Sequence, residues 1–299
     1  MEPINFSEVK YALLTPSKVC SQKMTYCGGV YSNNSLIRDL LRPSILAYKS
    51  NNSDFYFCPK STESHRSAYY GGYWIDHFGH FLLETLPLLG SMAASNTRLP
   101  ILFHYWNSLP NLDSGYVADC LKALGIDKSR IYFVHENAVI AESLHICIPA
   151  IKLIGGVSDH RAIYSFHQIR KHFGVNKGLS RKVYFTRRKT PNTCRKVIGE
   201  RDIESIFVAK GYEIVAPERL DFKDQVRLVS SCAEIAGVDG SALHLAAFAN
   251  PLTKMRVLAT RDCRLILAVN KTMGLRTSIV EIPLNIDDSV IRAISTRLG

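Results

Sequence analysis

Two ionisable side chains with the spacing of a general base lie in an apolar stretch near residue 80. The sequence from Phe78 onward has the pattern of an apolar helix, and His80 and Glu84 stand four residues apart in it. That spacing puts them on one helical face, within hydrogen-bonding reach. A carboxylate beside an imidazole fixes its tautomer and stabilises the imidazolium as a proton arrives. The pattern predicts a base at His80 supported by Glu84, with Asp76 one turn earlier as the reserve candidate.

The same residues admit two other interpretations. His80 and Glu84 can form a half-buried pair that satisfies its own hydrogen bonds, as buried polar groups generally must. His77, His80 and Glu84 can also be the ligands of a metal-dependent hydrolase. Their spacing departs from H-E-x-x-H, however, and no distant third ligand stands out.

A second stretch, residues 237–250 (GVDGSALHLAAFAN), has the pattern of a buried strand, a glycine turn and an apolar helix. Ser241 suits the N-cap or first turn of that helix. Unpaired amides at a helix start carry about half a positive charge, which suits a phosphate or diphosphate. We predict that the amides of Gly240, Ser241 and Ala242 face such an anion, although most corners of this kind in α/β proteins bind nothing.

Residues 181–201 (RKVYFTRRKTPNTCRKVIGER) form a strongly basic segment with a strand-like start at 182–186. A strand that delivers Arg187 from its carboxyl end places a forked guanidinium where α/β folds bind ligands. Arg195 is the second arginine that we expect at an anion. The alternative is a solvated basic loop.

The elements around these residues alternate between strand and helix. The first half has a βαβ pattern, with strands expected at 100–103 and 131–134 and a helix at 117–124. In the second half we expect strands at 183–186, 213–216, 234–238 and 256–259, and helices at 200–210, 222–232 and 241–249. A connecting helix is expected at 160–173. The pattern predicts an α/β fold of two Rossmann-like domains facing a cleft, residues 1–160 and 161–299.

Composition limits the partners. The chain has 299 residues, a formal net charge of +11 and a pI near 9.3, so acidic partners are favoured: nucleotide diphosphates, an anionic membrane surface or nucleic acid. Eight cysteines are scattered without a C-x-x-C pair, which indicates reduced thiols. Residues 1–14 do not have the basic and apolar regions of a signal peptide, and no stretch of this sequence approaches about 20 apolar residues. We expect a cytoplasmic protein with at most peripheral contact with an anionic membrane.

Three blocks in a fixed order resemble glycosyltransferase family 61, whose bacterial members are often described as capsular polysaccharide biosynthesis proteins. The first block is His80-Phe81-Leu82-Leu83-Glu84-Thr85-Leu86-Pro87. The second is Thr186-Arg187 followed by Arg195-Lys196-Val197-Ile198-Gly199-Glu200, and the third runs from Gly211 to Phe248. The chain departs from the family pattern at Gly199, where Asn is usual, and at Asp239, where His is common. His244-Leu245 replaces the usual Thr-Asn.

The resemblance implies a two-domain GT-B enzyme that transfers a sugar, with inversion, from a nucleotide-sugar to a hydroxyl of a glycan or lipid-linked glycan. The acceptor is expected on the N-terminal domain and the donor, expected to be a UDP-sugar, on the C-terminal one. No D-x-D motif is present, so arginines and the helix start would replace a metal ion. A bacterial capsule or O-antigen pathway is the expected setting. The donor-binding set is Arg187, Arg195, Glu200, Asp239, Gly240, Ser241, Ala242 and His244.

Two further alternatives stay open. A basic module that binds nucleic acid fits the charge, but the sequence has no RNA-binding motif or aromatic stacking platform, and we expect no nucleic-acid partner. A serine hydrolase built on Ser241 lacks the G-x-S-x-G elbow.

Overall fold

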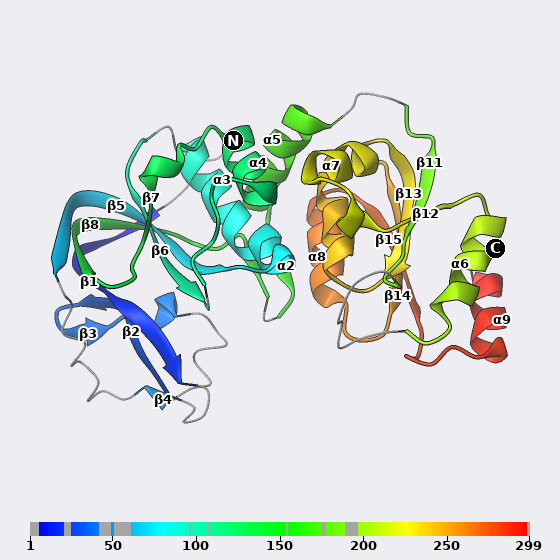
Figure 1. Cartoon of the computed structure of the whole chain (residues 1–299), viewed down its shortest axis with the longest axis horizontal. Coiled ribbons are helices and arrows are strands. Elements are labelled where there is room, and N and C mark those ends of the chain that lie inside the picture. Colours follow the sequence, from blue (N-terminus) through cyan, green and yellow to red (C-terminus); the bar gives the residue numbers. More distant parts are fainter. Residues whose placement is uncertain are drawn as a thin grey trace. The chain divides into compact units, whose positions relative to one another are not determined.

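The chain divides into two compact units (Figure 1). A computed structural model describes residues 6–20, 25–41, 49–50, 61–95, 97–106, 108–153, 155–174, 178–188 and 197–297. The first unit comprises Met1–Asp113 and Leu124–Ala150, and the second comprises Ser114–Ala123 and Ile151–Gly299. None of the helices in the described ranges is long and apolar enough to span a bilayer.

The first unit is built on a mixed sheet in the order β3-β2-β1-β8-β5-β6-β7, with β4 paired to β2. Strands β8, β5, β6 and β7 run parallel to one another, whereas β1 pairs antiparallel with both β2 and β8. The strands are β1 (Phe6–Cys20), β2 (Thr25–Ser32), β3 (Ser35–Leu36), β4 (Lys49–Ser50), β5 (Thr62–Ile75), β6 (Ile101–Trp106), β7 (Ile131–Phe133) and β8 (Ala138–Cys147). The expected Rossmann-like layer is therefore parallel only in part.

The segment after β5 forms a continuous run of helical turns. It consists of α2 (Phe78–His80), a π-helical turn η2 (Phe81–Thr85) and α3 (Leu86–Ala94). Trp74, near the end of β5, is fully buried, and its ring centroid lies 5.4 Å from that of Phe81 and 5.0 Å from that of Phe103. This aromatic core fixes the end of β5 against the helical run. Short 3₁₀ turns lie at Arg38–Leu40 and Lys128–Arg130.

The second unit has an all-parallel sheet in the order β12-β11-β13-β14-β15. Its strands are β11 (Arg181–Phe185), β12 (Glu213–Val215), β13 (Cys232–Val238), β14 (Lys254–Ala259) and β15 (Arg276–Glu281). From β11 the chain continues to β12, which lies on one side of β11 in the sheet. From β13 it continues to β14, which lies in the opposite direction. The strand order therefore reverses between β11 and β13, which is where open parallel sheets bind ligands.

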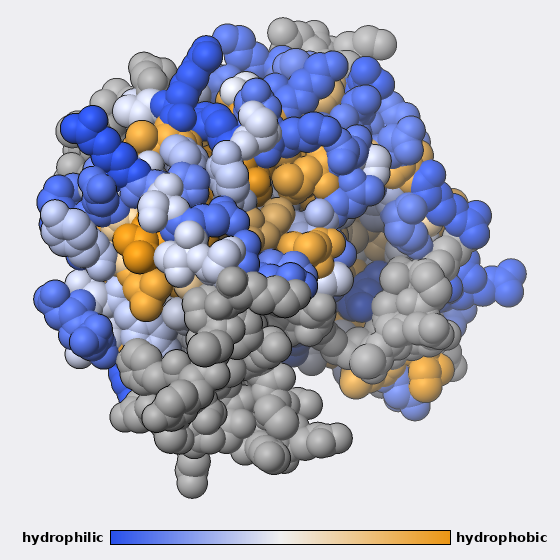
Figure 2. All heavy atoms as spheres, turned by 60° about the vertical axis from the view of Figure 1, so that its left-hand side comes forward, coloured by the Kyte–Doolittle hydropathy of each residue, from blue (hydrophilic) through white to orange (hydrophobic). Residues whose placement is uncertain are grey.

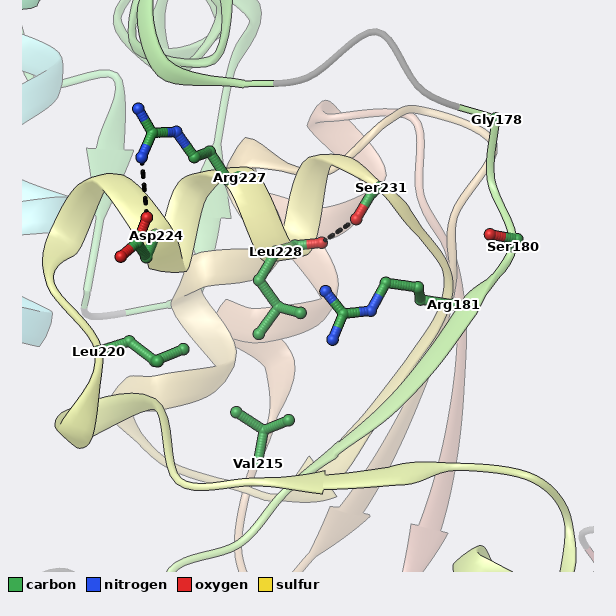
Figure 3. A pocket seen from close by; sticks show the side chains of 9 residues that line it. All are labelled: Gly178, Ser180, Arg181, Val215, Leu220, Asp224, Arg227, Leu228 and Ser231. Atoms are coloured by element: carbon green, nitrogen blue, oxygen red, sulfur yellow. Dashed lines mark hydrogen bonds and ion pairs between the residues drawn. The ribbon is translucent and has the colours of Figure 1, made fainter.

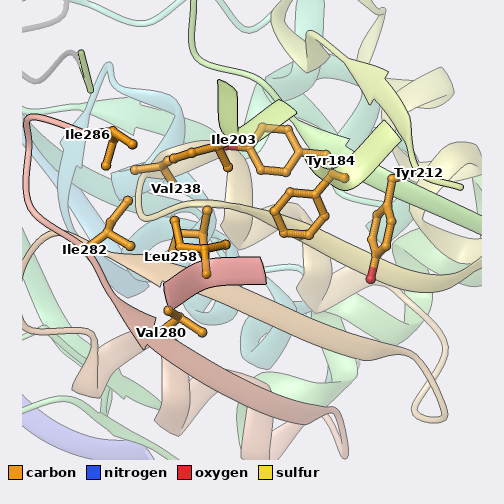
Figure 4. Close-up of a cluster of buried hydrophobic side chains, with 11 residues drawn as sticks. Tyr184, Ile203, Tyr212, Val238, Leu258, Val280, Ile282 and Ile286 are labelled. Atoms are coloured by element: carbon orange, nitrogen blue, oxygen red, sulfur yellow. The ribbon is translucent and has the colours of Figure 1, made fainter. Parts of the chain in front are cut away.

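Helices cover both faces of this sheet (Figure 1). Helices α6 and α9 pack together on one face, and α5, α7, α8 and the 3₁₀ segment η6 are packed against one another on the other. Figure 4 shows the buried cluster on the first of these faces, where Tyr184 and Leu258 from the sheet contact Ile203 of α6. The helices are α4 (Gly115–Leu124), α5 (Ile163–Phe173), α6 (Glu200–Ala209), α7 (Phe222–Ser230), α8 (Arg264–Thr272) and α9 (Asp288–Arg297). Smaller elements are β9 (Ile151–Lys152), β10 (Val157–Ser158), η4 (His160–Ala162) and η5 (Pro217–Arg219).

The parallel α/β pattern predicted for the second half is confirmed. One expected helix differs in type, because η6 (Ser241–Phe248) is a 3₁₀ helix rather than an α-helix. Five of its eight residues are buried, so packing on several sides, not an amphipathic pattern, sets its geometry. On the face shown in Figure 2, hydrophilic side chains predominate and hydrophobic ones form separate patches.

Candidate functional site

The guanidinium of Arg187 joins the carboxyl ends of β11 and β13. Arg187 follows β11 by two residues, and its Nη1 donates a hydrogen bond of 2.6 Å to the backbone oxygen of Asp239, the residue after β13. The sequence predicted that Arg187 leaves a strand at its carboxyl end, and the structure places it at the point where the strand order reverses. We call Arg187, Asp239 and Gly240 the arginine corner.

Gly240 makes room for this guanidinium. A Cβ atom at Gly240 would lie 3.2 Å from both Cζ and Nη1 of Arg187. The φ of Gly240 is 163°, which is extended backbone open to any residue. Close approach of the arginine, rather than a strained turn, is therefore what favours glycine here.

The backbone amides of Ser241 and Ala242 come before the first hydrogen-bonded turn of η6. The first backbone hydrogen bond of the segment runs from Leu243 N–H to Gly240 O over 3.0 Å. Ser241 and Ala242 are both partly exposed. Their N–H groups have the position that a helix start offers to an anion, although a 3₁₀ turn supplies it here.

The Asp239 side chain is fully buried and points into a network at the end of β14. Its carboxylate accepts hydrogen bonds from the N–H and hydroxyl of Thr260, at 2.7 and 2.6 Å, and from Nε of Arg261 at 2.8 Å. Burial alone raises the pKa of Asp239, but these hydrogen bonds outweigh it and hold the pKa below its ordinary value. The charge is thus balanced within the protein.

Glu200, the first residue of α6, holds the backbone of the arginine corner in place. Its carboxylate is buried and accepts hydrogen bonds from the backbone N–H of Arg187, at 3.0 Å, and from the Tyr184 hydroxyl, at 3.2 Å. Burial raises the pKa of Glu200. The preceding Gly199 has a φ of +86°, in the left-handed region that Gly and Asn tolerate best. The replacement of the family's usual Asn by Gly therefore keeps the same backbone conformation accessible.

The structure adds little about two other residues that we predicted to bind the nucleotide-sugar donor. His244 is partly exposed within η6. Arg195 lies outside the described residues. Thr186 and Arg188 flank the arginine corner, and both bind the buried carboxylate of Glu204, which the sequence did not single out.

In the first unit, His80 and Glu84 form the expected pair. Nδ1 of His80 lies 2.6 Å from Oε1 of Glu84, and their side chains are 38% and 19% exposed. The pair spans the π-helical turn η2, whose Leu86 N–H bonds to Phe81 O, five residues back. Such turns are rare and occur frequently at functional sites. The accessible imidazole on an acidic partner has the arrangement of a general base.

Asp76 and His77 lie at the same turn, just after β5, and both are exposed. The His77 ring centroid is 5.1 Å from that of His80. Partial burial, together with the nearby His80, lowers the pKa of His77. His77 is thus a second imidazole beside the pair, which the sequence suggested only as a metal ligand. We call Asp76, His77, His80 and Glu84 the histidine corner.

The metal-triad interpretation finds no support. Across the described ranges, no group of three or more His, Cys, Asp or Glu side chains is placed to hold a metal ion. The contact that His80 makes with Glu84 is the general-base arrangement instead.

Two cavities in the described part of the second unit are lined by residues other than the three of the arginine corner. One, of about 540 Å³, lies beside α7 and includes Arg181, Arg227 and Leu228 (Figure 3). Its arginines bond to acids, Arg181 to Glu213 and Arg227 to Asp224. The other, of about 470 Å³, is lined by Thr186, Arg188, Arg201, Glu204, Ser205, Val208, Ile214 and Ala216.

A family model described as Glycosyltransferase 61 matches residues 78–256, more than half of the chain. The chain belongs to glycosyltransferase family 61. No curated protein matches it. The resemblance inferred from the sequence is confirmed at the level of the family, which supports glycosyltransferase activity.

The region matched to glycosyltransferase family 61 contains all of the arginine corner and half of the histidine corner. It begins two residues before His80 and includes Arg187 and Gly240. Asp76, His77 and the two partners of Asp239 fall outside it. Thr260 and Arg261 were missed because nothing near Asp239 in sequence points to them. Both residues follow β14, which lies parallel to β13, and the carboxyl ends of adjacent parallel strands lie at one edge of a sheet. This rule could have placed them beside Asp239.

Proposed function

We propose that the chain is an inverting, metal-independent glycosyltransferase of the two-domain GT-B type. It transfers a sugar from a nucleotide-sugar, expected to be a UDP-sugar, to a hydroxyl of a glycan or lipid-linked glycan acceptor. We propose the biosynthesis of bacterial capsule, O-antigen or a related polysaccharide as its setting. The donor would bind to the second unit and the acceptor to the first.

The observation that carries this proposal is the arginine corner at the strand-order reversal of a parallel sheet. Arg187 is fixed by its bond to Asp239 O, and Gly240 leaves room for its guanidinium. A guanidinium beside the amides of Ser241 and Ala242 is suited to a diphosphate, because both supply hydrogen-bond donors to its oxygens. Charge that develops on the leaving diphosphate would be neutralised there.

The histidine corner supports the chemical step. In a single displacement, the acceptor oxygen bonds to the anomeric carbon as the bond from that carbon to the diphosphate oxygen breaks. The hydroxyl proton must pass to a base. With Nδ1 of His80 bonded to Glu84, Nε2 is the ring nitrogen that takes the proton, and the Glu84 carboxylate stabilises the resulting imidazolium.

Thermal unfolding of the full chain with a panel of nucleotide-sugars tests the proposal. A ligand at about 100 times its dissociation constant adds about 2.7 kcal/mol to the stability of the folded state. We expect one nucleotide-sugar to raise the melting temperature, in the presence of EDTA as in its absence. Transfer that EDTA abolishes would contradict metal independence, and a panel without any stabilising member would contradict donor binding.

A further inference from the structure

One face of the second unit's sheet is covered by helices over only part of its length. Toward the carboxyl ends of the strands, Tyr184, Val238, Leu258 and Val280 join the buried cluster under α6 and α9 (Figure 4). Alternate residues of a strand lie on the same face. The residues two and four positions earlier on these strands therefore share this face, toward the amino ends.

That half of the face is basic. It carries Lys182 on β11, Lys254 and Arg256 on β14, and Arg276 on β15, which together we call the basic sheet face. Lys254 and Arg276 are exposed, and the side chains of Lys182 and Arg256 are 41% and 27% exposed. The acid on these strands that faces them is Glu234, which lies 3.2 Å from Arg256 and 3.6 Å from Lys182. Four cations and one anion leave a net charge of +3 (4 − 1).

The pairing of the strands puts like charges side by side. The register aligns Glu234 with Lys254, and Lys254 with Arg276, across three adjacent strands. Neither Lys254 nor Arg276 pairs with an acid in the described part of the chain. Like charges at directly paired positions destabilise a sheet. An anion bound across them would remove this repulsion.

We propose that the basic sheet face docks onto an anionic phospholipid membrane. Charge complementarity favours phosphate headgroups, and a second copy of the chain would be repelled from the same face. Among the described residues, the aromatic ring that lies under Lys182 is that of Tyr212, which is buried, so this part of the chain offers nucleic acid no base-stacking platform. The proposal does not depend on the transferase activity, because no residue of this face belongs to either corner.

Sedimentation of the full chain with lipid vesicles tests this contact. We expect binding to vesicles of equimolar phosphatidylcholine and phosphatidylglycerol, weakening as salt rises, and no binding to pure phosphatidylcholine. Arg276→Glu changes two charge units and should reduce the partition coefficient about thirtyfold, since each basic residue near the surface contributes about fivefold. The same substitution makes the charges at the paired positions 234, 254 and 276 alternate in sign. The melting temperature of the variant should therefore equal or exceed that of the wild type.

Lys122→Glu is the matched control. Lys122 is an exposed lysine of α4, elsewhere in the second unit, and its reversal changes the net charge equally. It should retain wild-type binding. An equal loss in Lys122→Glu would show that only total charge matters, and would overturn the proposal. Failure to bind the anionic vesicles while binding single-stranded DNA through Arg276 would assign the face to nucleic acid and overturn it as well.

Discussion

The arginine corner and the histidine corner follow strand ends in different units, yet they are built in opposite ways. At the arginine corner, the guanidinium of Arg187 donates to the backbone oxygen of Asp239, and the backbone N–H of Arg187 donates to the buried carboxylate of Glu200. At the histidine corner, Asp76 and His77 are exposed, and His80 keeps more than a third of its side chain accessible. A pre-positioned cation suits binding, whereas accessible imidazole and carboxylate groups suit proton transfer.

The largest expected effect separates chemistry from binding at the histidine corner. His80→Ala should reduce the transfer rate by roughly 10² to 10⁴, the usual range for a general base, while leaving donor affinity unchanged. Glu84→Gln should cause a smaller loss, because the imidazole keeps its place but loses a charged partner. Steady-state rates at saturating donor measure both. Near-normal turnover in His80→Ala, with an inactive Asp76→Asn, would move the role to the carboxylate.

The second prediction removes the cation of the arginine corner and tests binding rather than chemistry. Arg187→Ala should weaken nucleotide binding tenfold or more, because a charge-assisted hydrogen bond contributes about 1.5–3 kcal/mol. Arg188→Ala is a close control, since the neighbouring arginine pairs with Glu204 instead. Calorimetry with UDP, GDP and CMP provides the measurement. If the wild type binds one of them and Arg187→Ala binds it equally well, the donor phosphates lie elsewhere.

The smallest effect concerns the support of the arginine corner and depends on pH. The folded-state pKa of Asp239 lies below its unfolded value. The ionised carboxylate therefore stabilises the fold above the unfolded pKa, and this contribution is lost as pH falls through the folded pKa. Asp239→Asn should cost about 2 kcal/mol of unfolding free energy at neutral pH and progressively less in acid.

Denaturant unfolding at several pH values measures this difference. Asp262→Asn is the control, because Asp262 is exposed and its bond to Arg264 is open to solvent, so the change should matter little. A penalty for Asp239→Asn that stayed constant with pH would show that shape, not charge, is what position 239 requires.

The sequence predicted the second unit better than the first. Parallel strands such as β13 and amphipathic helices such as α6 are bounded by clear turn residues, so the alternation is visible in one chain. The antiparallel pairing of β1 with β2 and β8 was not predicted, because strand partners far apart in sequence leave no local pattern. Neither the 3₁₀ segment nor the π turn was predicted, since packing sets both.

The same contrast holds within the candidate site. The contact between His80 and Glu84 follows from their spacing alone and could be predicted. The partners of Asp239 could not, because Thr260 and Arg261 come 21 and 22 residues later, just after the next strand, β14. Sequence spacing therefore captured the local pair, whereas the network that neutralises Asp239 required the fold.

The π turn at Phe81–Thr85 makes the histidine corner depend on residue count as well as residue identity. A π turn holds one residue more than an α turn, and every later position of the helix is displaced by one residue, or about 100° around the axis. The buried residues of α3, Leu86 and Leu89 among them, follow this turn directly, so the added residue sets which of them faces which part of the core. Relatives that differ here by a single insertion or deletion would keep every functional side chain in their sequence, yet aim the base in another direction.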